Sequence, residues 1–112
     1  MDLYEQIEKL MNELTTSISL LRKNGTALAE AERDYKITLR QEALKLRVEK
    51  DMPVTLINQV IFGVPIVAEL RFKRDVAQTT YDANLEHINV TKLKLRILEN
   101  QLSREWGNVK NS

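Results

Sequence analysis

The stretch that decides the fold reads MPVTLINQVIFGVPIVA and runs from Met52 to Ala68. It contains both prolines of the chain and no charged side chain, although 29% of all residues are charged. A proline disfavours helical geometry in the residue before it, so we expect the chain to bend at Met52 and Val64. The sequence on either side has the periodicity of amphipathic helices. The pattern therefore predicts two helical arms joined by an apolar tip, at residues 51–64.

The first arm is expected to contain two helices, at about residues 2–24 and 27–50. Asp2 can cap the first of them. Its apolar stripe comprises Leu3, Ile7, Leu10, Leu14, Ile18 and Leu21. The face of the second helix comprises Leu28, Ala31, Tyr35, Leu39, Ala43 and Leu46. Gly25 can take the left-handed conformation that ends helices, and Thr26 can cap the second helix, so we predict that the first arm is broken near Gly25.

The second arm is expected to be a single helix from about Pro65 to Trp106, with Gly107 as its stop. It would span roughly 60 Å, against roughly 70 Å for the two helices of the first arm placed end to end. Folding the chain near residue 58 as an antiparallel pair places Tyr35 opposite Tyr81. These features predict an all-α fold, namely a long antiparallel helical hairpin or coiled coil.

This last helix is apolar on two opposite sides. One stripe comprises Val67, Leu70, Ala77, Tyr81, Leu85, Ile88, Leu95, Leu102 and Trp106. The other comprises Phe72, Val76, Ala83, Val90, Leu93 and Ile97. A hairpin covers only one side, so either the first helix folds back to make a three-helix bundle or another subunit covers the second stripe. We favour a homo-oligomeric helical bundle with an interface at Phe72, Val76, Val90, Leu93 and Ile97, because long exposed stripes are rare.

The tip leaves two structural alternatives open. The segment from Val54 to Phe62 is compatible with a short helix capped by Thr55 or with an irregular loop. Its apolar side chains either fill the end of the hairpin or a dimer core, or form a surface that docks a partner. In the second case Asn58 and Gln59 would supply hydrogen bonds to that partner.

Composition narrows the classes of protein that remain. The 112 residues allow one domain, and 17 Lys and Arg against 16 Asp and Glu give a net charge of only +1. Nucleic-acid binding calls for a more basic balance. The chain has no cysteine, and it shows neither a secretory signal nor an uninterrupted apolar run long enough for a membrane span. We expect a cytoplasmic protein that does not contact a membrane.

Catalytic and metal-binding residue sets are missing from the sequence. His87 is the only histidine, and no cysteine or second histidine can complete a zinc site with it. No phosphate-binding glycine loop or nucleophile elbow is present. We therefore expect neither enzymatic activity nor a cofactor.

Five cations flank the tip from both arms: Arg47, Lys50, Arg71, Lys73 and Arg74. We call these residues the basic collar. Ordinary helix-end and surface charge explains them, and so does a site that holds phosphates. In the second interpretation the candidate site combines the basic collar with Thr55, Asn58, Gln59 and Phe62.

Three segments carry a resemblance to known sequences. They are Met52-Pro53-Val54-Thr55-Leu56-Ile57, Val67-Ala68-Glu69-Leu70-Arg71-Phe72, and Leu93-Lys94-Leu95-Arg96-Ile97-Leu98 with the later pair Glu105-Trp106. Over about residues 27–106 the chain resembles small uncharacterised helical proteins of phages and prophages of Gram-positive bacteria. The resemblance implies a non-catalytic binder inside the bacterial host, either one that disarms host defence or an accessory to replication and recombination.

These observations support two hypotheses of function. The first is a homo-oligomer that binds and neutralises a host factor, either a defence protein or a small phosphate-containing signal molecule. The second is a nucleic-acid accessory protein in phage replication or recombination, which the near-zero net charge disfavours. A scaffold role in the virion is a weaker third possibility.

Overall fold

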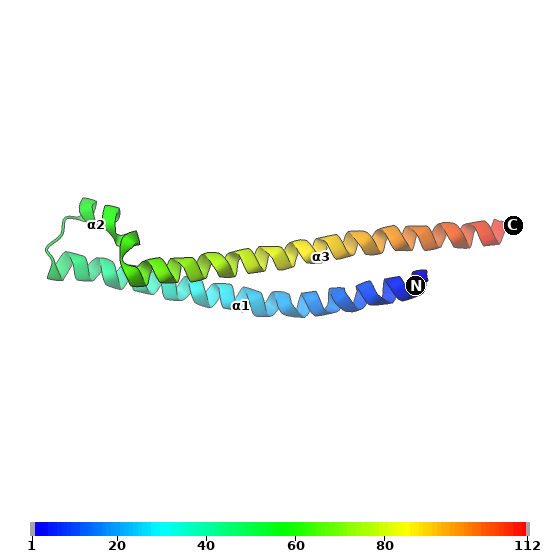
Figure 1. Ribbon diagram of the computed structural model, residues 1–112, viewed down its shortest axis with the longest axis horizontal. Helices are drawn as coiled ribbons and strands as arrows, with labels where there is room; N and C mark the ends of the chain where they lie inside the picture. The colour runs from blue at the N-terminus through cyan, green and yellow to red at the C-terminus, as the bar shows by residue number, and fades with distance from the viewer. Residues whose placement is uncertain (1, 112) are drawn as a thin grey trace. The chain divides into compact units, whose positions relative to one another are not determined.

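The computed structural model describes residues 2–111, with side chains described for residues 2–107. The chain forms helix α1 (Leu3–Glu49), the short helix α2 (Val54–Val60), the 3-10 turn η1 (Ile61–Gly63) and helix α3 (Pro65–Asn111) (Figure 1). The predicted all-α hairpin with a proline-bounded apolar tip is confirmed. Its contacts divide it into two units. The tip-side unit is Asn24–Tyr81, and the terminal unit combines the segment up to Lys23 with the segment from Asp82.

Helix α1 is uninterrupted, so the predicted break near Gly25 and the cap at Thr26 are wrong. No glycine has a positive φ among the described residues, and Gly25 is an ordinary helical residue. It packs beside Tyr81, since a Cβ atom placed on Gly25 would lie 3.4 Å from Cε2 of Tyr81, which is ordinary contact distance. Since α1 does not fold back, the three-helix bundle is not formed. The capping prediction for Asp2 is confirmed by the Glu5 N–H, which donates to Asp2 Oδ1 at 2.8 Å.

The predicted bends at Met52 and Val64 are confirmed. Helix α1 ends before Asp51, whose φ of 49° is the one positive value at a non-glycine residue among those described. The Met52 N–H donates to the Leu46 carbonyl at 3.2 Å, and Arg47 Nη1 donates to the Met52 carbonyl at 3.1 Å. Pro53 precedes α2 in extended geometry with no side-chain cap, so the predicted cap at Thr55 is wrong. Val64 is extended before Pro65, which begins α3 as expected.

The core of the tip-side unit joins α2 and η1 to both long helices. Its buried side chains are Tyr35, Ile57, Ile61 and Val67. Partly buried apolar side chains packed against them are Leu39, Ala43, Leu46, Met52, Val64 and Leu70. The apolar side chains of the tip therefore divide between the two predicted arrangements. Ile57 and Ile61 fill the end of the hairpin, and Leu56, Val60 and Phe62 remain exposed.

The register between α1 and α3 differs from the predicted one. Tyr81 lies against Gly25, and Tyr35 lies beneath the guanidinium of Arg74, so Tyr35 and Tyr81 are not opposite each other. The cause is the tip, because α2 and η1 fold back onto the last turns of α1 and α3 starts beside Tyr35 and Leu39. This displaces the pairing by seven to ten residues, which is about two to three helical turns.

The core of the terminal unit contains a polar layer. Buried residues are Ser17, Ile88, Thr91 and Leu95. The Asn84 Nδ2 donates to the Ser17 carbonyl at 3.1 Å. Ile18, predicted to face inward, is exposed, because the inward position is taken by the smaller Ser17, which allows Asn84 to reach its carbonyl.

The end of α3 also differs from the sequence prediction. Gly107 does not stop the helix, which continues to Asn111. Trp106, placed on the core stripe by its spacing, is 59% exposed. Its Nε1 lies 3.3 Å from the hydroxyl of Tyr4, at the end of the helix pair.

The predicted second apolar stripe of α3 is exposed. Phe72 and Val76 lie in the tip-side unit, and Val90, Leu93 and Ile97 lie in the terminal unit. In neither unit does α1 cover them, as expected for a hairpin. That a second subunit covers them stays a prediction.

No single helix among the described residues is both long and apolar enough to cross a membrane. By length and composition alone, the pair made of Val54–Gly63 and Pro65–Gly107 meets the same criterion, with a 62° bend between its two parts.

The contact at Gly25 gives a first prediction. Gly25→Ala removes the helix penalty of glycine and adds a methyl group at ordinary contact distance from Tyr81, so the free energy of unfolding should rise by about 1 kcal/mol. Urea denaturation followed by circular dichroism, at fixed protein concentration, measures this change. The matched control Ala29→Gly, at an exposed position of α1, should lower stability by a similar amount. A loss of stability in Gly25→Ala would mean that Tyr81 has no room for the methyl group.

Candidate functional site

The exposed apolar side chains of the tip come from three consecutive elements. We define the tip surface as Val54, Leu56, Val60, Phe62 and Ile66. Their exposed fractions run from 38% at Val60 to 61% at Val54. No charged residue interrupts the chain between Met52 and Ala68, so the tip surface has only Asn58, Gln59 and Thr55 as exposed polar neighbours in sequence.

The two faces of α2 explain how this surface is supported. Ile57 and Ile61 are spaced by one helical turn and are only 6% and 4% exposed. They anchor α2 and η1 in the core of the tip-side unit. Leu56 and Val60, also one turn apart, therefore face outward on a segment that is fixed from behind. The tip surface is a supported apolar surface.

Cations of the basic collar are mostly engaged within the chain. The guanidinium of Arg71 lies over the ring of Phe62, with 4.9 Å from Cζ to the ring centroid. Arg47 is held by the Met52 carbonyl. Lys50 and Lys73 are exposed and form no ion pair with the residues that the structure describes.

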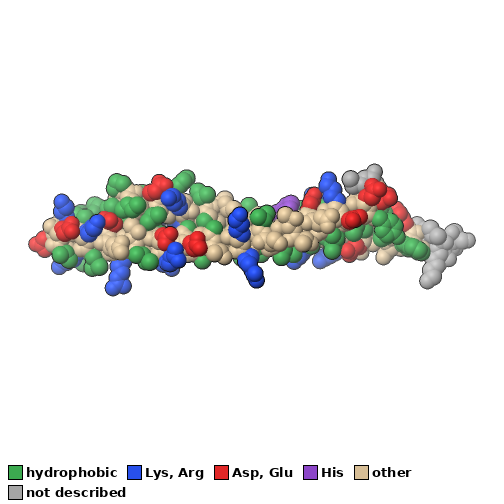
Figure 2. Space-filling view, turned by 90° about the horizontal axis from the view of Figure 1, so that it is seen from below, with side chains coloured by type: hydrophobic (Ala, Val, Ile, Leu, Met, Phe, Trp, Pro, Cys, Tyr) green, Lys and Arg blue, Asp and Glu red, His purple; other side chains and the backbone are tan. Residues whose placement is uncertain are grey.

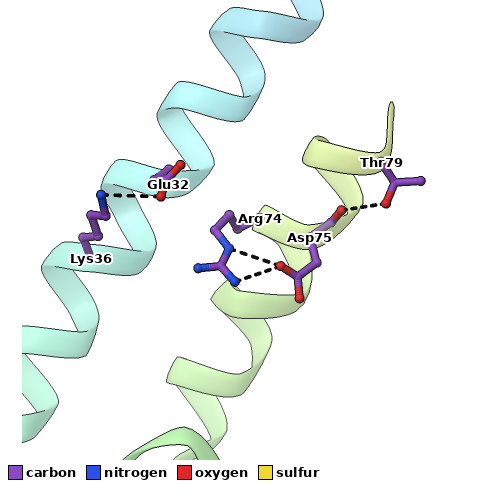
Figure 3. A network of polar contacts seen from close by, with 5 residues as sticks. All are labelled: Glu32, Lys36, Arg74, Asp75 and Thr79. Carbon is purple, nitrogen blue, oxygen red and sulfur yellow. Dashed lines mark hydrogen bonds and ion pairs between the residues drawn. The ribbon is translucent and has the colours of Figure 1, made fainter. Parts of the chain in front are cut away.

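Arg74 has the most contacts of the five. Its Nε and Nη2 donate to Oδ1 of Asp75 at 3.1 and 2.9 Å (Figure 3). Its Cζ lies 4.6 Å from the ring centroid of Tyr35, which is buried. The hydrogen bond with Asp75 raises the pKa of Arg74 above its ordinary value. The neighbouring Glu32 is paired with Lys36 at 3.4 Å, and Thr79 Oγ1 donates to the Asp75 carbonyl.

The arrangement does not gather the basic collar around one point. Of the candidate site residues, Phe62 and Arg71 are brought together, while Arg47 and Arg74 make contacts elsewhere. Figure 2 shows one face of the molecule, on which Lys and Arg are spread along the helices and interspersed with Asp and Glu. Phosphate recognition needs several free donors that converge, and only Lys50 and Lys73 remain without a partner in the described part of the chain.

Sequence reasoning missed two participants in this region. Ile66 belongs to the tip surface, and its spacing of four from Phe62 could have indicated a shared face. Tyr35 was assigned to the apolar stripe, and its role as the platform for Arg74 depends on the register of α1 and α3. No local signal in the sequence reveals that register.

A separate hollow of about 610 Å³ lies in the terminal unit. It is lined by Glu5, Glu8, Lys9, Asn12, Glu13, Thr16, Ser17 and His87. Within the described residues no group of three His, Cys, Asp or Glu side chains is placed to hold a metal ion. His87 is exposed at this hollow.

The stacking of Arg74 on Tyr35 gives a second prediction. Arg74→Ala removes the cation–π contact and the hydrogen bonds to Asp75, and should lower the free energy of unfolding by about 1 kcal/mol. Lys73→Ala removes the same charge from the preceding residue without a described contact, and should change stability by less than about 0.5 kcal/mol. Urea denaturation of the two variants decides the point. Equal effects in both would mean that Arg74 adds nothing through Tyr35.

Comparison of the chain with protein-family models, with curated proteins and with solved structures found no match in any of the three.

Proposed function

We propose that this chain is a non-catalytic binding protein that self-associates and docks a protein partner through the tip surface. The observation that carries the proposal is the exposure of Val54, Leu56, Val60 and Phe62 on a segment anchored by buried Ile57 and Ile61. An exposed apolar surface with a fixed backbone is typical of a binding interface, because little conformational entropy is lost when the partner binds.

The composition of the tip surface supports a protein partner. Aromatic and Arg side chains are enriched among the residues that dominate protein interfaces, and Phe62 with Arg71 forms such a pair here. Asn58 and Gln59 lie exposed beside the apolar side chains and can supply the polar rim. A docked protein would cover both the apolar side chains and this rim.

A phosphate-containing ligand is less well supported. Arg47, Arg71 and Arg74 already contact a carbonyl, a ring and a carboxylate of this chain. Each guanidinium keeps further N–H donors, but these contacts turn the three groups toward different parts of the chain, so they do not converge on one phosphate. The net charge of +1 gives no long-range attraction for nucleic acid either.

The resemblance to small phage and prophage proteins indicates where the partner comes from. We infer that it is a protein of the bacterial host, and that the chain neutralises it by occupying its surface. Catalysis is not needed for this role, which agrees with a sequence that has one histidine and no cysteine.

Variants of the tip test this function. The double variant Leu56→Ser with Val60→Ser keeps Ile57 and Ile61 in the core and removes two exposed apolar side chains one turn apart. Immobilised wild type should capture a specific protein from a Gram-positive host lysate. The double variant should bind the same protein, once purified, about tenfold or more weakly, because both changes remove buried apolar contact.

The control is Val48→Ser, which changes an apolar side chain that is 78% exposed and lies outside the tip surface. It should bind the purified protein as wild type does. Unchanged binding by the double tip variant contradicts the proposal. If instead Arg47→Glu with Arg74→Glu abolishes binding while the tip variant does not, the basic collar is the site.

A further inference from the structure

The terminal unit presents a second exposed apolar surface, on α3. We define the outer stripe as Val90, Leu93 and Ile97, which are 38%, 53% and 54% exposed. Their spacings of three and four residues are those of a coiled-coil seam. The buried residues Ile88 and Leu95 of the same helix segment lie on its opposite side. This segment therefore carries one seam that is covered by α1 and one that is uncovered.

Charged side chains of both signs accompany the outer stripe: Lys94 flanks one side of it, and Glu86 and Arg96 bear on its pairing. Glu86 continues its spacing one turn before Val90, and Arg96 flanks it next to Ile97. Both side chains are exposed, and neither forms an ion pair with the residues that the structure describes. Ten residues separate them, which is about 15 Å along a helix, so they cannot pair within one chain.

We propose that the outer stripe binds the outer stripe of a second copy of this chain in antiparallel orientation, with a twofold axis midway between residues 91 and 92. This inference rests on the self-association included in the proposed function and specifies its interface. Val90 packs against Leu93 of the second copy, and Ile97 packs against the methylene groups of Glu86. Arg96 then reaches the carboxylate of Glu86 on the second copy, and symmetry forms each contact twice.

Charge decides the orientation. A parallel pair in register would place Glu86 opposite Glu86 in the seam, where two like charges repel and lose solvent. The antiparallel pair replaces that repulsion by two Glu86–Arg96 ion pairs.

Self-complementarity identifies the occupant. Across the twofold axis, each apolar residue of the outer stripe meets an apolar side chain or side-chain methylene groups of the second copy, and each of the charges of Glu86 and Arg96 meets the opposite charge. A second copy therefore satisfies Glu86 and Arg96 together without any other residue. The layer beyond, which pairs Ala83 with Asn100 of the second copy, is small and polar and marks the end of the contact.

Charge reversal tests the pairing. The wild-type chain should have a solution mass of about twice 13.0 kDa in light scattering coupled to size exclusion. Glu86→Arg and Arg96→Glu alone should each weaken the dimer by about tenfold or more, because each replaces two attractions by two repulsions. The double variant Glu86→Arg with Arg96→Glu should restore wild-type dimerisation. Glu99→Arg, the same change at an exposed position of α3 outside the outer stripe, should leave the dimer unchanged.

Cysteine cross-linking tests the orientation, because the natural chain contains no cysteine. A mixture of Ala83→Cys and Asn100→Cys chains should form a disulfide-linked dimer under mild oxidation, and neither variant should do so alone. Cross-linking of each variant by itself would overturn the antiparallel arrangement. A monomeric mass, or no rescue by the double charge variant, would overturn the interface. Either failure would leave partner capture by the tip surface to be judged separately, with the tip variants.

Discussion

The packing of Ile57 and Ile61 against Tyr35 and Val67 is the contact on which the rest of the structure depends. It folds the uncharged tip back onto α1, and so it sets the point along α1 at which α3 begins. From that point the register of the two helices is fixed in the tip-side unit. The approach of Tyr81 to Gly25 and the stacking of Arg74 on Tyr35 both result from it. The same contact holds the outward side of α2 in place.

Features determined by local chemistry were predictable from the sequence. The proline-bounded tip, the bends before Pro53 and Pro65, the cap at Asp2 and the two faces of α3 all result from backbone restrictions and periodicity. The prediction of a helix break at Gly25 was wrong because tertiary packing overrides the low helix propensity of one glycine. The predicted register of α1 and α3 was wrong because the register depends on how far α2 folds back along α1. No local sequence pattern encodes that distance.

The composition of the candidate site was predictable from the sequence, and the contacts of its cations were not. The sequence predicts that apolar residues and cations meet at the tip, because the two prolines fix where the chain turns and the cations stand next to that turn in the sequence. The sequence does not predict which cations have contacts within the chain. Arg74, for example, stacks on Tyr35 of α1 and donates to its neighbour Asp75. A collar drawn from sequence thus overstates the number of cations available to a ligand. In the structure, the five exposed apolar side chains of the tip surface outnumber Lys50 and Lys73, the two collar cations without a described contact.

The hydrogen bond between Trp106 and Tyr4 has a practical consequence. Trp106 is the only indole in the chain, and it lies where the first turns of α1 meet α3 in the terminal unit. Its fluorescence emission therefore reports on the separation of α1 from α3 at this end without any added label. Two of the three tyrosines lie in the tip-side unit but Tyr4 lies beside Trp106, so excitation at the long-wavelength edge, where only the indole absorbs, follows fraying of the ends apart from melting near the turn.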